Sequence, residues 1–170
     1  MNFTKPTNTI DTLNIGQRPL ITKWLDEHYI KNYIVNDDMT IDVNSDVFCA
    51  NWFTFFDIYT LIEFPKYIKF GKIKGKFSCQ GLNFVSLRGC PEEVTETFSC
   101  AENDLISLDH CPKKVGLSFV CHNNRVQFIK EDVLKRCVVG KKIYTEDVFT
   151  KSYQVKGIKP DVSIRSNWNC

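Results

Sequence analysis

The hydrophobic pattern of this chain repeats at every 21st position. A phenylalanine and a cysteine flank a single residue in three segments, Phe77-Ser-Cys79, Phe98-Ser-Cys100 and Phe119-Val-Cys121. Apolar residues follow these segments at matching positions, and the pair Cys-Pro recurs once at the same spacing. A period of about 20 to 29 residues with apolar positions locked to it is typical of a stacked solenoid.

Each Phe-x-Cys segment alternates inward and outward positions, as a short β-strand does. Leucine-like residues then fill the turn, and Cys-Pro ends it, because proline fixes φ and has no amide hydrogen to leave unpaired. One coil buries too few side chains to fold by itself, so neighbouring coils have to stack, and we expect their phenyl rings and thiols to align in columns inside. The sequence therefore predicts an α+β, mostly β fold: a short leucine-rich-repeat-like solenoid with 21-residue coils and helical caps at both ends.

Residues 1–45 form a predicted N-terminal cap of this single structural domain. We expect residues 1–17 to be extended, because threonine, asparagine and proline dominate them. Apolar residues at helical spacing predict a helix from Leu20 to Tyr29, with Pro19 in its first turn. Two short apolar runs, 33–35 and 40–43, flank a polar turn and predict a hairpin.

The solenoid itself is predicted to span residues 46–128. Val47-Phe48-Cys49 has the composition of an earlier strand, but the step from Cys49 to Cys79 is clearly longer than one period. The excess is an aromatic insertion at 50–64 that contains Trp52, Phe53, Phe55 and Phe56. Either this insertion adds to the core, or part of it projects as an apolar patch that binds a partner.

Residues 129–170 are predicted to form a C-terminal cap and tail. The repeat pattern breaks after Cys121, and Lys130–Val138 has helical spacing with Val133, Leu134 and Cys137 on one face. This half is basic: residues 130–170 carry 9 basic and 5 acidic side chains, whereas residues 1–48 carry 4 basic and 7 acidic ones. Solvated surfaces explain both sets, and a net charge of +2 gives little general attraction for nucleic acid.

Composition favours a soluble, non-catalytic protein. Of the 170 residues 43% are apolar and 25% are charged, and no run of 18 apolar residues predicts a membrane span. Residues 1–18 are polar, so we expect no secretory signal and a cytosolic location. The eight cysteines follow the repeat rather than metal-ligand spacing, which favours buried thiols over zinc or disulfides, and we expect no cofactor. No nucleophile, phosphate-loop or metal-pair motif predicts an enzyme.

The repeats and the segments before them resemble small leucine-rich-repeat-like proteins of tailed bacteriophages, especially T-even relatives. The resemblance begins at Asn32-Tyr33-Ile34-Val35-Asn36-Asp37-Asp38, includes Phe70-Gly71-Lys72-Ile73-Lys74-Gly75, and ends near Arg125, a little over half of the chain. The chain departs from the pattern in its aromatic insertion and at Leu82, where the next coils have Asn103 and Asn124. The resemblance implies an early, host-directed activity in the bacterial cytoplasm, without a shared target and without catalytic residues.

Two functional hypotheses follow. In the first, the protein binds a host protein, such as RNA polymerase or a defence factor, and blocks or redirects host machinery. Its contact surface would combine Trp52, Phe53, Phe55 and Phe56 of the insertion with six outward strand positions: Ser78, Gln80, Ser99, Ala101, Val120 and His122. In the alternative, it binds host RNA polymerase and shuts off or terminates host transcription, with a basic face near DNA: Lys135, Arg136, Lys141 and Lys142. In both hypotheses nucleic acid is a secondary partner, no membrane takes part, and the sequence does not predict the oligomeric state.

Overall fold

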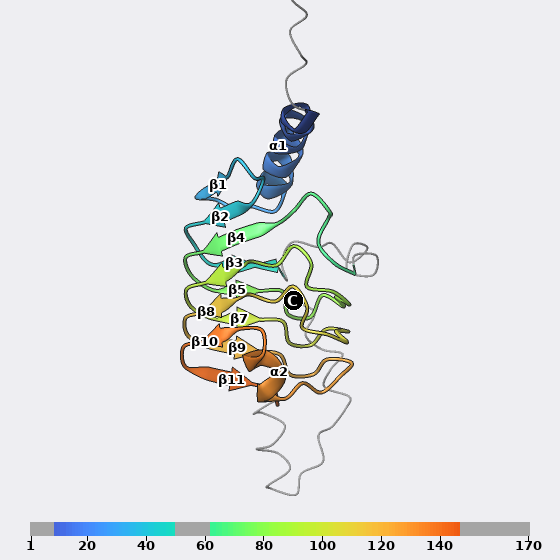
Figure 1. Ribbon diagram of the computed structural model, residues 1–170, viewed down its shortest axis with the longest axis vertical. Coiled ribbons are helices and arrows are strands. Elements are labelled where there is room, and N and C mark those ends of the chain that lie inside the picture. Colours follow the sequence, from blue (N-terminus) through green and yellow to red (C-terminus); the bar gives the residue numbers. More distant parts are fainter. Residues whose placement is uncertain (1–8, 50–61, 147–170) are drawn as a thin grey trace, which may run out of the picture.

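Two stacks of short strands form the body of the protein, with a helix near each end of the described chain (Figure 1). The computed structural model describes residues 9–49 and 62–146. The protein is mostly β with few helices, and it winds into a β-solenoid of about three turns. Within the described ranges, neither helix is long and apolar enough to span a lipid bilayer.

The strands belong to two sheets, which we call sheet A and sheet B. Sheet A has six strands, in the spatial order β1 (Tyr33–Val35), β2 (Ile41–Val43), β4 (Phe70–Ile73), β6 (Glu93–Val94), β8 (Lys114–Val115) and β10 (Val138–Val139). Sheet B has five, in the order β11 (Lys142–Tyr144), β9 (Ser118–Val120), β7 (Phe98–Ser99), β5 (Phe77–Ser78) and β3 (Val47–Phe48). The two helices are α1 (Thr9–Glu27) and α2 (Lys130–Leu134).

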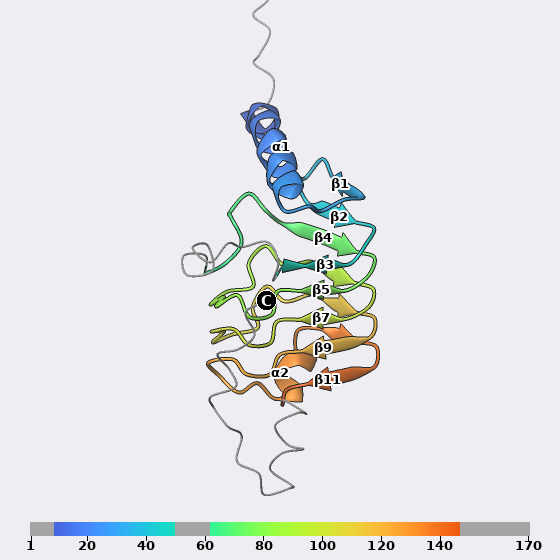
Figure 2. The ribbon, with the colours of Figure 1, turned by 180° about the vertical axis from the view of Figure 1, so that it is seen from behind.

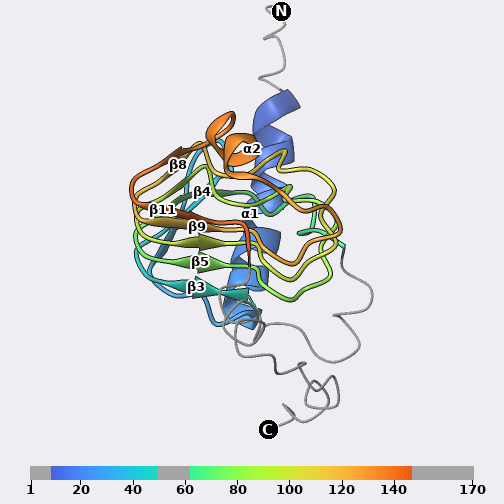
Figure 3. The same cartoon turned by 90° about the horizontal axis from the view of Figure 1, so that it is seen from below.

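Each turn contributes one strand to sheet A, then a corner, then one strand to sheet B (Figure 2). The described parts of the segments that return to sheet A contain no strand. The view from below shows successive turns lying over one another (Figure 3). All neighbouring strands pair in parallel, apart from the antiparallel pair β1–β2. Parallel pairing is expected when a chain coils in one direction and places equivalent segments side by side.

The predicted column of phenylalanine rings is confirmed. Phe77 pairs with Phe98 and Phe98 with Phe119, and all three side chains are fully buried. Their ring centroids lie 5.9 and 5.1 Å apart along the column. Parallel strands lie about 4.8 Å apart, so each ring packs directly on its neighbour in the next turn.

The N-terminal part confirms the hairpin and the early strand but corrects the helix. β1 pairs with β2 in the predicted hairpin, and β3 pairs with β5, as expected for Val47-Phe48. The prediction of an extended chain up to residue 17 is wrong from Thr9 onward, because α1 begins there and includes Pro19. A proline inside a helix removes one hydrogen bond, and its ring crowds the carbonyl four residues before it. Burial of Ile21, Trp24 and Leu25 in the core offsets this cost.

The end of this helix also differs from the prediction. α1 ends at Glu27, and Tyr29 lies beyond it with a left-handed backbone (φ 55°) and 85% of its surface exposed. The following residue, Ile30, is buried in its place. Because Tyr29 has a left-handed backbone, the side chain that is buried after the helix is that of Ile30 and not, as the helical spacing predicts, that of Tyr29.

The C-terminal part continues both sheets, so the solenoid extends beyond its predicted end at residue 128, although the 21-residue pattern does break after Cys121. Val139 pairs with Val115, and Ile143 with Phe119, each one strand further along its sheet. The step between these partners is longer than the regular period, because α2 lies within this turn. This helix is shorter than predicted, and Leu134 is 59% exposed, whereas Val133 is buried as expected.

The cysteines line the inside of the solenoid. The seven described ones are free thiols, and six of them are buried, with Cys111 half-buried. Burial raises the pKa of Cys49, Cys90 and Cys100 well above the usual value, and it raises the pKa of Cys121 to about 12. A thiol reacts as its thiolate, so these side chains act as small apolar packing groups at neutral pH.

Candidate interaction surface

The outward face of sheet B carries an uncharged column of side chains that crosses all five strands. Strand alternation turns Val47, Phe77, Phe98 and Phe119 into the core, so the next residue of each strand points outward. We call these outward residues the sheet B column: Phe48, Ser78, Ser99, Val120 and Tyr144, which are partners in the ladder from β3 to β11. Two serines and a valine occupy its middle, and an aromatic ring stands at each end.

Sheet A differs, because its outer side carries a ladder of ion pairs. Glu92 accepts hydrogen bonds from two lysines of the turns on either side, with distances of 3.1 Å to Lys69 Nζ and 3.0 Å to Lys113 Nζ. Glu93 does the same, 3.3 Å from Lys72 Nζ and 3.2 Å from Lys114 Nζ. Charged groups that are already paired contribute little to recognition of an apolar partner, so sheet B is the better candidate for a contact surface.

We expect the ion-pair ladder to make stability depend on acidic pH. Hydrogen bonds and charge from the flanking lysines hold the pKa of Glu92 and of Glu93 below the usual value. A carboxyl group whose pKa is lower in the folded state stabilises the fold at pH values above its pKa in the unfolded chain, which is near 4.5. This stabilisation is lost as the pH falls through the pKa of the folded state. The lysines are well exposed, so the total is roughly 0.5–1 kcal/mol at pH 7 after solvent screening.

The measurement is the free energy of unfolding in denaturant between pH 3 and 7. A Glu92→Gln, Glu93→Gln double variant should lose about 0.5–1 kcal/mol at pH 7 and show a flatter profile below pH 5 than the parent. The difference should shrink in 1 M salt, because screening weakens exposed pairs. A double variant as stable as the parent at pH 7 and low salt would show that the ladder has no energetic role.

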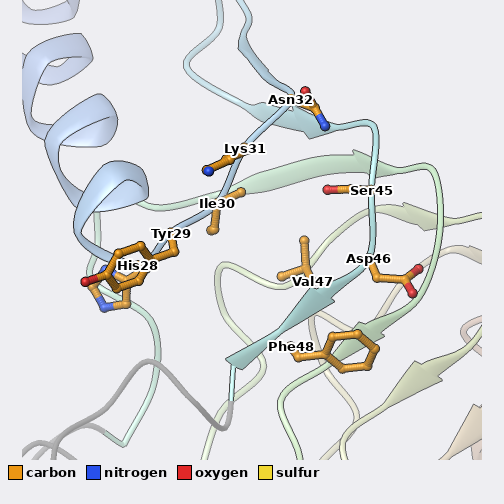
Figure 4. A pocket seen from close by; sticks show the side chains of 9 residues that line it. All are labelled: His28, Tyr29, Ile30, Lys31, Asn32, Ser45, Asp46, Val47 and Phe48. Carbon is orange, nitrogen blue, oxygen red and sulfur yellow. The ribbon is translucent and has the colours of Figure 1, made fainter.

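A groove lies at the β3 edge of sheet B, between β3 and the segment that follows α1, and no other described strand pairs with β3 on this side (Figure 4). It has a volume of about 430 Å³ and is lined by His28, Tyr29, Ile30, Lys31, Asn32, Ser45, Asp46, Val47 and Phe48. Sheet A has a further strand, β1, beyond β2, whereas the described strands of sheet B end with β3. Sheet B is therefore one strand shorter than sheet A on this side.

The backbone of β3 is oriented to accept another strand in this groove. Val47 donates its N–H to the carbonyl of Lys76 on the β5 side, at 2.8 Å. Because alternate residues of a parallel strand bond to opposite sides, the N–H and C=O of Phe48 point away from β5. The ring of Phe48 is 47% exposed. An exposed sheet edge beside an apolar side chain is a recognition mode for extended peptides.

The structure brings together most of the predicted strand positions but buries two of them. Ser78, Ser99 and Val120 lie side by side in the sheet B column. Ser99 is only 8% exposed, and its Oγ donates a hydrogen bond to Oε1 of the half-buried Gln80 at 3.3 Å, so Gln80 is the more accessible of this pair. Ala101 is fully buried, so its predicted outward position is wrong: β7 ends at Ser99, and strand alternation no longer applies two residues later.

Two other groups of predicted residues have different outcomes. His122 is half-buried, and its buried Nδ1 has no hydrogen-bond partner in the described part of the chain. The aromatic residues of the insertion lie outside the described residues: Trp52, Phe53, Phe55 and Phe56. Phe64, at the end of the predicted insertion, belongs to the core and is 1% exposed.

The four basic residues of the alternative hypothesis do not form one free patch. Lys135 lies 3.8 Å from Asp132, and Arg136 Nε lies 3.3 Å from Asp109 Oδ1. Lys141 and Lys142 are exposed and have no ion pair within residues 9–49 and 62–146. Within the described part of the chain, this second pair is therefore available to a polyanion without breaking an ion pair.

Sequence reasoning missed the two aromatic ends of the sheet B column. Phe48 had a usable signal, because Val47-Phe48-Cys49 matches the Phe-x-Cys segments with Phe48 at the outward position. Tyr144 had none, since its turn is longer than the regular period.

Comparison of the chain with protein-family models, with curated proteins and with solved structures gave no match.

Proposed function

We propose that this chain is a bacteriophage-encoded, non-catalytic interaction module that binds a host protein. It acts in the cytoplasm of the host bacterium, where it blocks or redirects host machinery during infection. The sequence resemblance to T-even phage proteins supports the origin and the host-directed role. The uncharged sheet B column beside an open strand edge is the observation that supports the mode of action.

The scaffold in this proposal is a leucine-rich-repeat-like stack of 21-residue coils with a helical cap at each end. The burial of Ile21, Trp24 and Leu25 of α1 against the core supports a capping role at the N-terminal end. Val133 of α2 is buried in the same way at the other end. Terminal coils of a solenoid need such covers, because each would otherwise expose the apolar face that its neighbours bury.

Binding in this proposal uses two features together. A strand of the partner adds to the edge of β3 through main-chain hydrogen bonds with Phe48, which provides affinity with little sequence preference. The side chains of the sheet B column then contact the partner's surface, and the two aromatic ends provide most of the apolar burial. Aromatic residues in partly enclosed sites frequently dominate binding energies.

Affinity capture from a lysate of the bacterial host, followed by mass spectrometry, tests the proposal. We expect the parent protein to recover one stoichiometric host protein, and Phe48→Asp to reduce the recovery at least tenfold, because a carboxylate at the edge cannot pack against an apolar surface. Ile34→Asp is the matched control: Ile34 is 56% exposed on β1 of sheet A, and its replacement should leave recovery unchanged. Failure to recover any stoichiometric partner would count strongly against the proposal.

A second candidate is that the partner is host RNA polymerase and that the protein shuts off or terminates transcription. The exposed Lys141 and Lys142 at the β11 end support it, because they have no competing carboxylate among the described residues. In vitro transcription by the host polymerase separates the two candidates. Unchanged transcription at saturating protein would dispose of this one without affecting the first.

A further inference from the structure

A second concave site lies where the return segments lead into β4, β6 and β8 of sheet A. This pocket has a volume of about 420 Å³ and is formed by three successive turns, at residues 66–69, 88–92 and 110–113. Its charged and titratable lining consists of Lys66, Lys69, Arg88, Glu92, His110 and Lys113. Pockets for small ligands have volumes of about 300 to 1,000 Å³, so a molecule of nucleotide size is within range.

The pocket carries a surplus of positive charge after its ion pairs are counted. Glu92 is shared between Lys69 and Lys113, and Arg88 pairs with Glu63, which lies next to the pocket. Lys66 has no carboxylate partner within the described ranges. Four cationic side chains against the two carboxylates that form salt bridges with them leave a balance of +2.

His110 occupies a position that a glycine fills in the turn before it. Its backbone is left-handed, with φ 66°, and Gly89 has φ 89° at the equivalent position of the preceding turn. A residue with a Cβ is strained in this conformation, whereas glycine is not. The backbone of this turn therefore does not require a histidine. The imidazole of His110 adds a hydrogen-bonding group to the rim of the cationic pocket.

The remaining lining is apolar. Ile68 and Cys90 are buried, and Pro91 forms part of the same wall. A pocket with an apolar wall and a few convergent polar groups is typical of sites that hold a small organic molecule by one charged end.

We propose that this pocket binds a phosphate dianion, either as inorganic phosphate or as the monoester of a small molecule such as a nucleoside monophosphate. A surplus of two charges matches such a dianion, and lysine and arginine are the usual phosphate-binding side chains. Nucleic acid fits less well, because its backbone needs a row of free cations along a face. The lysines that extend along sheet A from this pocket, Lys72 and Lys114, are instead paired with Glu93.

Isothermal titration calorimetry on the full chain tests this site with AMP, inorganic phosphate and adenosine as probes. We expect AMP to bind with one-to-one stoichiometry, adenosine not to bind, and higher salt to weaken the AMP affinity. Equal affinities for AMP and inorganic phosphate would assign the site to the free anion, and tighter binding of AMP would assign it to a monoester. No binding of either phosphate compound, or equal binding of adenosine, would overturn the proposal.

Three variants connect the binding to this pocket. Lys66→Gln removes an unpaired charge and should weaken AMP binding about tenfold, and His110→Gly should weaken it while retaining the fold, because Gly89 shows that glycine suits the turn. Lys74→Gln is the matched control, since Lys74 is exposed but does not line the pocket. Equal weakening in the control would place the binding elsewhere.

Tight binding of a single-stranded oligonucleotide without binding of AMP would also overturn the proposal, in favour of nucleic acid. The result does not depend on the proposed protein partner.

Discussion

Replacing Asn103 by alanine is expected to lower the free energy of unfolding by about 4 kcal/mol. The side chain is 6% exposed and holds two turns of the solenoid together. Its Oδ1 accepts hydrogen bonds from the N–H groups of Leu82 and Phe84 in the preceding turn, both at 3.0 Å. Its Nδ2 lies within 2.8 to 3.2 Å of three carbonyl oxygens, those of Cys79, Cys100 and Ala101.

The large effect follows from what the substitution leaves behind. Alanine would leave two backbone N–H groups and the carbonyl of Cys79 without their partner in a buried turn, where water cannot replace the lost amide without opening the structure. The carbonyls of Cys100 and Ala101 keep hydrogen bonds from Asn124 Nδ2 and from the N–H of Gly81. An unsatisfied buried polar group costs about 1 to 3 kcal/mol. Unfolding in urea, followed by circular dichroism, measures the loss of stability, and a change of less than about 1 kcal/mol would show that the amide does not hold the turns together.

The chain offers two graded controls for this experiment. Asn124 occupies the equivalent place one turn later but is only half-buried, and its Oδ1 accepts one hydrogen bond, from Leu105 at 3.2 Å. Asn124→Ala should therefore cost roughly half as much as Asn103→Ala. Asn44 is exposed, and Asn44→Ala should change stability by less than about 0.5 kcal/mol.

The same repeat shows how far the sequence alone could predict the fold. The Phe-x-Cys spacing predicted the stacked rings, because identical strands in a solenoid have to align and their inward side chains coincide. It also indicated that Leu82 breaks the asparagine pattern. It could not predict β10 and β11, since there the step becomes longer and isoleucine replaces phenylalanine at Ile143.

The interaction surface was only partly predictable for a related reason. Periodicity placed Ser78, Ser99 and Val120 in one column, but strand alternation fails once a strand ends, which is why Ala101 is buried rather than outward. The ion-pair ladder had a signal that spacing arguments can detect, because Glu92 and Lys113 have opposite charges one period apart. The proposed phosphate pocket had none, since it needs Lys66, which lies outside the regular repeats.

Gly116→Ala is expected to destabilise the protein by about 3 kcal/mol or more. Gly116 lies at the corner between β8 and β9, where the backbone of one turn rests directly on that of the turn before it. A Cβ at this position would collide with the carbonyl oxygen of Thr95 and would lie 2.9 Å from its carbonyl carbon. Backbone atoms held in a hydrogen-bonded ladder cannot move aside as the end of a flexible side chain can, so the two turns would have to separate.

Gly140 and Gly16 provide the comparison that makes this result specific. A Cβ at Gly140 would meet the carbonyl oxygen of Gly116 in the same column, but β10 and β11 are the last described strands of their sheets and can shift more easily. Gly140→Ala should therefore cost less than Gly116→Ala. Gly16 lies in α1, and no atom lies within 4 Å of the position that a Cβ would occupy there, so Gly16→Ala should stabilise the helix by up to about 1 kcal/mol.

Thermal and urea unfolding of the three variants measures this order of stabilities. The expected order, Gly16→Ala above the parent, then Gly140→Ala, then Gly116→Ala, depends on turns that touch through their backbones at the corner. If Gly116→Ala were as stable as the parent, the corner would have room for a side chain. Successive turns would then stack less tightly than the parallel pairing from β4 to β8 requires. Both proposed sites need a rigid surface, and this surface would be lost.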